Sequence, residues 1–169
     1  MLDASVLIAL ARIRHLDLVR RTYGRAVIGP VVFEEVVTAG KRVGALGVEQ
    51  VEHAIGLGWL SVVTPTLTER RLIKRILNTS RLHGGEAESI AIAKRRKLPV
   101  ILDDKEARGV AGAHGLDLMG TAGMLLEAYF AGHLNLDLLA GILMELSAVM
   151  WLSPRVVAAV LKLAREERR

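Results

Sequence analysis

The sequence predicts an α/β fold in which a short parallel sheet is covered by helices on both faces. Short apolar segments rich in β-branched residues alternate with longer segments whose apolar residues recur at helical spacing. Acidic residues follow directly after two of the short segments, at positions 3 and 103–104. The carboxyl ends of parallel strands are where open sheets of this kind build their sites.

The chain is expected to form one domain. Its 169 residues suffice for one substantial core but not for two comfortable ones. Within residues 1–169 we expect a core over about 1–131 and a C-terminal helical extension over about 132–169.

The first part of the chain begins with a very short strand piece, Met1 and Leu2, which delivers Asp3. Ser5 can then cap a helix whose apolar residues continue as far as Leu18. Pro30 suits the first turn of the next helix. The further expected elements are strands at residues 26–28 and 59–63, and helices at 31–39, 48–55 and 67–77.

The second part alternates in the same way and then becomes helical. We expect strands at residues 99–102 and 116–119, and helices at 85–97, 105–113, 121–131, 136–149 and 154–167. The most apolar stretch, residues 138–152, contains Glu145 and is too short to cross a bilayer comfortably. It is better interpreted as a buried helix, or as a contact in a homodimer.

Composition narrows the function classes. The absence of cysteine excludes disulfides, a thiolate nucleophile and sulfur-ligated zinc, and it favours a cytoplasmic location. The net charge of +5 favours a polyanionic partner, although solvated helix faces would explain it equally well. Aromatic residues are few, so a stacking platform for single strands is not expected, and Met150 and Trp151 are placed in the core by default or in a dimer contact.

Acidic residues are the candidate chemical groups. Singly, Asp3 is an ordinary helix cap, and the Asp103–Asp104 pair is a strand-to-helix turn with a capping acid. Together with helical acids they indicate more. Helical spacing puts Glu86 on the core side of its helix and turns Glu88 the other way, toward a possible solvent ion pair.

The same argument separates a second pair of neighbouring acids. Glu35 lies on the flank of the apolar stripe of its helix, whereas Glu34 points almost opposite. Inward carboxylates near one another cannot all ionise without compensation. Mg²⁺ or Mn²⁺ supplies it, because these ions prefer carboxylate and water oxygens. Such ions support phosphodiester hydrolysis.

Other site classes are less well supported. The five histidines are scattered at spacings that form no metal motif, and His83, close to Glu86, is more readily a loop residue. Gly84 and Gly85 are not followed by the Gly-Lys-Ser/Thr of a phosphate-binding loop, so nucleoside triphosphate binding is not supported.

Five segments in this order resemble a PIN domain, and within that superfamily the DUF3368 group. They are DASVLIAL at residues 3–10, IGPVVFEEV at 28–36, GEAESIAIA at 85–93, ILDDKEAR at 101–108 and GTAG at 120–123. The resemblance covers nearly the whole chain. It implies a Rossmann-like α/β/α nuclease that holds Mg²⁺ or Mn²⁺ with three or four acids.

Position by position, the resemblance implies roles for particular residues. Asp3, Glu35 and Glu86 match the first three acids, Asp104 or Asp103 matches the last, and Ser5 matches a small hydroxyl residue that orients a ligand or water. The superfamily usually has Asp where Glu86 stands, and Glu88 is the alternative for that role. Arg12, Arg81 and Arg108 are candidates for holding the nucleic acid strand.

The resulting hypothesis is a metal-dependent endoribonuclease, the toxin of a toxin-antitoxin pair whose small antitoxin shields the acids. The alternative is a catalytically inactive PIN-like module that binds nucleic acid or protein. A third interpretation, a receiver-like phosphotransfer protein built on Asp103 and Asp104, lacks the further acids and the lysine it needs.

Overall fold

Two short pairs of parallel strands and the N-terminal residues form the centre of the molecule. The computed structural model describes residues 1–166. Each pair is parallel, and the strands are β1 (Ala26–Ile28) with β2 (Leu60–Val62) and β3 (Val100–Ile101) with β4 (Leu118–Met119). These observations confirm the expected α/β class with short parallel strands.

The first residues of the chain join the two pairs. The Leu2 amide donates a hydrogen bond of 3.1 Å to the Val27 carbonyl oxygen, on the side of β1. On the other side, Leu2 forms a parallel bridge with Ile101, and the Asp3 amide donates to the Ile101 carbonyl oxygen at 3.3 Å. The spatial order is therefore β2, β1, residues 1–3, β3 and β4.

Alternating side chains from these strands enter two separate cores. Leu2 and Ile101 belong to the larger core, whereas Met1, Val100 and Leu102 belong to the smaller one. Successive side chains of a strand point to opposite faces of a sheet, so even one or two residues per strand are enough to separate the two layers. The result is helices on both faces of the sheet.

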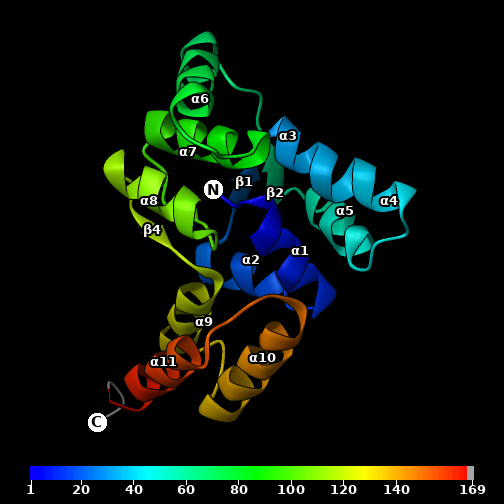
Figure 1. Ribbon diagram of the computed structural model, residues 1–169. Coiled ribbons are helices and arrows are strands. Elements are labelled where there is room, and N and C mark those ends of the chain that lie inside the picture. Colours follow the sequence, from blue (N-terminus) through cyan, green and yellow to red (C-terminus); the bar gives the residue numbers. More distant parts are fainter. Residues whose placement is uncertain (167–169) are drawn as a thin grey trace.

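The helices divide accordingly (Figure 1). Residues from α6 (Leu67–Thr79), α7 (Gly84–Arg96) and α8 (Lys105–Ala113) form the smaller core. The larger core contains residues of α1 (Ala4–Arg12), α2 (Asp17–Tyr23), α9 (Thr121–Phe130), α10 (Leu136–Val149) and α11 (Pro154–Glu166). It also takes residues from the segment between β1 and β2, which contains α3 (Pro30–Phe33), η1 (Glu34–Thr38), α4 (Ala39–Arg42) and α5 (Val48–Gly56).

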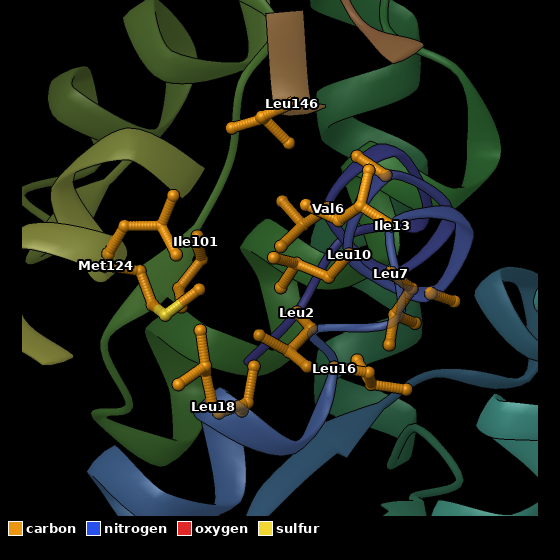
Figure 2. Packing of buried hydrophobic residues seen from close by; sticks show 14 of the residues in the cluster. Leu2, Val6, Leu7, Leu10, Ile13, Leu16, Leu18, Ile101, Met124 and Leu146 are labelled. Atoms are coloured by element: carbon orange, nitrogen blue, oxygen red, sulfur yellow. The ribbon is translucent and has the colours of Figure 1, made fainter. Parts of the chain in front are cut away.

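Helix α1 anchors Asp3 to the larger core. Figure 2 shows the side chains of Val6 and Leu10 gathered with Leu2, Ile101 and Met124, all of them buried. Burying side chains of this size stabilises the fold by roughly 1.5–3 kcal/mol each. Asp3 is therefore held in place, because Leu2 before it and α1 after it are both packed in the larger core.

The helical expectations need two corrections near the N-terminus. The helix expected to continue through Leu18 is two helices, because Arg14 has a positive φ of 59° between them. Ser5 does not cap α1, since the helix already starts at Ala4 and the Asp3 carbonyl oxygen accepts the first helical hydrogen bond, from the Leu7 amide.

The ends of the other helices and strands differ less from the expected ones. The helix expected at 31–39 extends from Pro30 to Arg42, and its middle, Glu34–Thr38, is a π-helical turn. Strands 59–63, 99–102 and 116–119 are shorter than expected, whereas 26–28, 105–113 and 136–149 are confirmed. Glu167, the expected end of the last helix, lies outside the described residues.

Trp151 is not a core residue, contrary to expectation. Its side chain is 87% exposed, whereas Trp59 is 7% exposed. α10 ends at Val149 and α11 starts at Pro154, so Trp151 lies in a linker without regular structure, outside the apolar faces of both helices. No helix among residues 1–166 has the length and apolar character needed to cross a membrane.

A buried ion pair joins α6 to α7 on the face of the smaller core. The Glu69 side chain is 2% exposed, and the Arg96 guanidinium donates to its two carboxylate oxygens at 2.7 and 3.0 Å. The same carboxylate accepts the Thr66 amide at the start of α6. The Arg96 hydrogen bond is the main reason that the pKa of Glu69 is lowered to about 2.

We expect Glu69→Gln to destabilise the protein by about 2 kcal/mol at neutral pH, because it leaves the partly buried Arg96 without a counter-charge. The folded-state pKa lies below the ordinary value of 4.5, so the contribution of Glu69 is present above pH 4.5 and is lost as the pH falls toward 2. Urea unfolding across this range measures it. The exposed Glu49→Gln is the matched control, and a Glu69→Gln difference that stays constant down to pH 2 would contradict the assignment.

Candidate active site

Asp3 is buried at the carboxyl end of the N-terminal strand piece. It is 4% exposed, and one carboxylate oxygen, Oδ2, accepts a hydrogen bond of 3.0 Å from the Ser5 hydroxyl. Although Asp3 occupies the N-cap position of α1, its side chain makes no capping hydrogen bond. Its Oδ1 is buried and has no hydrogen-bond partner among the described residues. An unpartnered buried carboxylate oxygen is costly and needs an explanation.

Asp3 lies close enough to three other acids, Asp103, Glu35 and Glu86, for their charges to affect one another's pKa values. Burial is the main cause that raises the pKa of Asp3, and the charge of Asp103 raises it further, whereas the Ser5 hydroxyl and the nearby amides of Ala4 and Ser5 lower it. Burial also raises the pKa values of Glu35 and Glu86, and the Asp3 charge adds to both. The charges of these acids thus reach one another, although Glu35 is exposed and is not the inward side chain that helical spacing predicted.

Glu35 reaches this edge from the π-helical turn. A π-turn widens a helix locally and redirects its side chains, and such turns are frequent at functional sites. The neighbouring helix α7 approaches closely, because a Cβ at position 85 would lie 2.8 Å from Oε2 of Glu35. Gly85 is therefore needed for the close approach of α7 to Glu35, and this reason could not be seen in the sequence.

Glu86 lies in the first turn of α7 and is only partly buried. Its Oε2 accepts the His83 amide at 2.8 Å in a capping box. The Asp104 charge raises its pKa, whereas His83 lowers it, as His83 also does for Glu35. His83 is an exposed N-cap residue outside the helix, which confirms its interpretation as a loop residue, and its charge reaches both Glu86 and Glu35.

Glu88 does not point to solvent, which corrects the sequence expectation. It is 3% exposed, because α7 is buried from Ala87 to Ala93 and has no solvent face there. Burial raises the pKa of Glu88, and the charge of Glu35 adds to this. Its Oε2 accepts the Val31 amide at 2.9 Å. Glu88 therefore caps, from α7, the helix that carries Glu35.

Gly29 makes this capping contact possible. A Cβ at position 29 would lie 1.9 Å from Oε2 of Glu88. No side chain can occupy that space while Glu88 stays in place. The pair holds the start of the Glu35 helix against α7, so its function in this structure is to position the helix.

Asp103 and Asp104 have different surroundings. Both oxygens of Asp103 accept hydrogen bonds from Thr121, the amide at 2.8 Å and the hydroxyl at 2.5 Å, which ties the end of β3 to the start of α9. Asp104 caps α8 by accepting the Ala107 amide at 2.8 Å, which confirms the capping alternative for this residue. Its charge nevertheless reaches Glu86.

The three arginines expected to hold the nucleic acid strand lie in different environments. Arg108 is half-buried, and its guanidinium donates to the Leu102 carbonyl oxygen at 3.1 Å. Arg12 is exposed and lines a cavity of about 540 Å³ that also contains Glu35. Arg81 is exposed, and its amide is bound by the Glu106 carboxylate at 2.9 Å. Arg12 thus lines a cavity with Glu35, and Arg108 lines another cavity with Asp103.

The donor chemistry suits a hard divalent cation, although within residues 1–166 no group of three or more His, Cys, Asp or Glu side chains is arranged as a ready-made metal site. The donors at this edge are carboxylate oxygens, and Asp3 has a buried oxygen without a partner. Positive charge here would offset both burial and mutual repulsion. Asp3, Glu35 and Glu86 are the carboxyl groups at this edge whose pKa values burial and neighbouring charges raise.

Comparison with known proteins agrees with this architecture. A family model described as a PIN domain, DUF3368, matches residues 1–166. Searches of curated proteins and of solved structures found no match. The match covers nearly the whole chain, and the sheet, its helices and the acids at the sheet edge all fall within it. The chain therefore belongs to the PIN-domain family, whose members are generally nucleases.

Proposed function

We propose that this protein is a divalent-metal-dependent endoribonuclease that hydrolyses RNA phosphodiester bonds. The observation that carries the proposal is the buried, unpartnered Oδ1 of Asp3 beside acids from other elements of the fold. Repulsion and burial both oppose ionisation of this group, so a bound cation would stabilise its ionised form. Membership of a family of nucleases supports the choice of phosphodiester hydrolysis.

Different acids have different parts in this proposal. Asp3, Glu35, Glu86 and Asp104 would hold Mg²⁺ or Mn²⁺, directly or through water, and the ion would supply charge stabilisation at the phosphodiester and a more acidic water. Ser5 orients Asp3 through its hydrogen bond. Asp103 supports the site by fixing Thr121 at the start of α9. Glu88 positions the Glu35 helix.

RNA is the proposed substrate because the site lies between cationic side chains on a chain of net charge +5. Arg12 shares a cavity with Glu35, and Arg108 shares one with Asp103. Contacts of this kind bind phosphates and position a strand without reading its sequence.

Asp3→Asn and Glu86→Gln should each lower the rate of RNA cleavage in Mg²⁺ or Mn²⁺ at least about 100-fold, because even residues that only support metal ligands typically contribute 10- to 100-fold. Cleavage of a labelled RNA, followed by gel electrophoresis, measures this. The matched control is Glu34→Gln, since Glu34 is exposed and pairs with Arg42 at 3.8 Å away from the acids. Equal rates for wild type and both site variants would defeat the proposal.

Calorimetric titration with Mn²⁺ tests metal binding without any cleavage. The wild type should bind Mn²⁺, Asp3→Asn should bind it at least about tenfold more weakly, and Glu34→Gln should bind it as the wild type does. The absence of a ready-made cluster of three ligands among the described residues favours the alternative, an inactive PIN-like module that binds RNA or a protein. RNA binding without Mn²⁺ binding or cleavage would support that alternative.

In a cytoplasmic setting the same activity would make the protein a toxin, controlled by a small antitoxin that covers the acids. Induced expression of the wild type in a bacterial host should then arrest growth, and Asp3→Asn should not, because only hydrolysis would be lost. Colony counts with matched protein levels measure the effect. Arrest by both proteins, or by neither, would contradict the toxin assignment.

A further inference from the structure

Trp151 is a large aromatic side chain that the fold leaves in water. Its exposed fraction of 87% contrasts with the packing of its neighbours in sequence, Met150 and Leu152, which are partly buried against the larger core. A single exposed apolar side chain is ordinary, but this indole lines a cavity together with a cation, Arg108, and a planar ligand could cover it there.

The cavity beside Trp151 has a volume of about 470 Å³. The linker between α10 and α11 forms one wall, and the ends of β3 and β4 with the start of α9 form another. Its lining includes Asp103, Arg108, Gly120, Gly123, Trp151 and Ser153. In Figure 1, β4 leads directly into α9, and α11 lies alongside α9. Asp103, whose charge reaches Asp3, is therefore part of the cavity lining.

The polar groups of the cavity are held in fixed positions. The Arg108 guanidinium donates to the Leu102 carbonyl oxygen, and its Nη1 would lie 3.1 Å from a Cβ at position 120. Gly120 therefore leaves room for the guanidinium and for Asp103, whose Oδ1 would lie 2.9 Å from the same Cβ. The first turn of α9, at the positive end of that helix, also lines the cavity.

We propose that this cavity is a nucleotide subsite, in which one base of a single-stranded RNA stacks on Trp151 and an adjacent phosphate faces Arg108. The inference rests on the proposed function and deepens it, because it assigns a place on this chain to one nucleotide of the RNA strand. An indole stacks on any base, so the subsite positions the strand beside the acids with little sequence preference. The fixed guanidinium of Arg108 favours a ligand that carries an anionic group, such as an RNA phosphate, over an apolar protein surface. The Asp103 carboxylate in the same lining is bonded to Thr121, so the phosphate is placed at Arg108 and not at Asp103.

The experiment uses the full chain with a short, single-stranded RNA in buffer that contains EDTA and no divalent ion, because the proposed hydrolysis needs Mg²⁺ or Mn²⁺ and binding can then be measured without cleavage. Tryptophan fluorescence and the anisotropy of a label on the RNA are recorded in the same titration. The wild type should show quenching that tracks binding, and Trp151→Ala should lose the quenching and bind about 5- to 100-fold more weakly. Trp59 is buried and serves as the internal reference.

Two controls separate stacking from other effects. Trp151→Phe retains an aromatic ring and should recover most of the affinity without the quenching. Phe130→Ala removes another exposed aromatic side chain, at the opposite end of α9, and should bind as the wild type does. A double-stranded RNA of the same sequence should bind without quenching, because its bases are already stacked.

The subsite is overturned if Trp151→Ala binds RNA as tightly as the wild type, if RNA binds without quenching, or if no RNA binds at all. A change in sedimentation of Trp151→Ala without any change in RNA binding would also overturn it and assign Trp151 to a contact between copies. Failure of the proposed function gives a different result. If RNA binds and quenches the tryptophan fluorescence but is never cut in Mn²⁺, the subsite is retained and the proposed hydrolysis is rejected.

Discussion

The structure depends on burying one carboxylate beside several others at the middle of a very small sheet. Asp3 has little freedom, because Leu2 on one side and α1 on the other are packed in the larger core and the Asp3 amide is bonded to β3. Burial and mutual repulsion raise the pKa values of the acids around it. The strong packing of α1 and β3 therefore maintains an electrostatically unfavourable arrangement, which is typical of functional rather than structural acids.

The edge of the sheet is assembled with few strand residues. At the centre of the sheet, Leu2 enters the larger core and Met1 enters the smaller one. Because the strands are so short, contacts from the helices hold the acids in place. Glu88 caps the helix that contains Glu35, the Asp103–Thr121 hydrogen bonds join β3 to α9, and Asp104 caps α8. Each of these side chains accepts a backbone amide, so acids around the site also define the positions of helix starts.

Much of this arrangement could be predicted from the sequence, because it depends on periodicity and on where strands end. The alternation of apolar segments located β1, α8 and α10 closely, and the acids at 3 and 103–104 followed from strand ends. Helical spacing failed at Glu88, since a helix buried on all sides has no solvent face to which a residue can be assigned.

Other features depend on tertiary contacts that a linear pattern does not contain. The π-turn at Glu35 and the approach of α7 over Gly85 arise from packing between elements. The exposure of Trp151 follows from where two helices stop, and composition alone favoured a core position for it. Gly84 and Gly85 precede an acid in the sequence, but nothing in the linear pattern indicates that Gly85 faces the Glu35 carboxylate.

The contact between Gly29 and Glu88 has a consequence for how such chains can diverge. A Cβ at position 29 would lie only 1.9 Å from the Glu88 carboxylate, so a side chain at 29 requires a change at 88. That change is either a displaced Glu88 carboxylate or a shorter residue, and both would leave the Val31 amide without its present acceptor. Substitutions at these two sites should therefore covary between homologous sequences, even though neither residue is proposed to touch a metal ion or RNA.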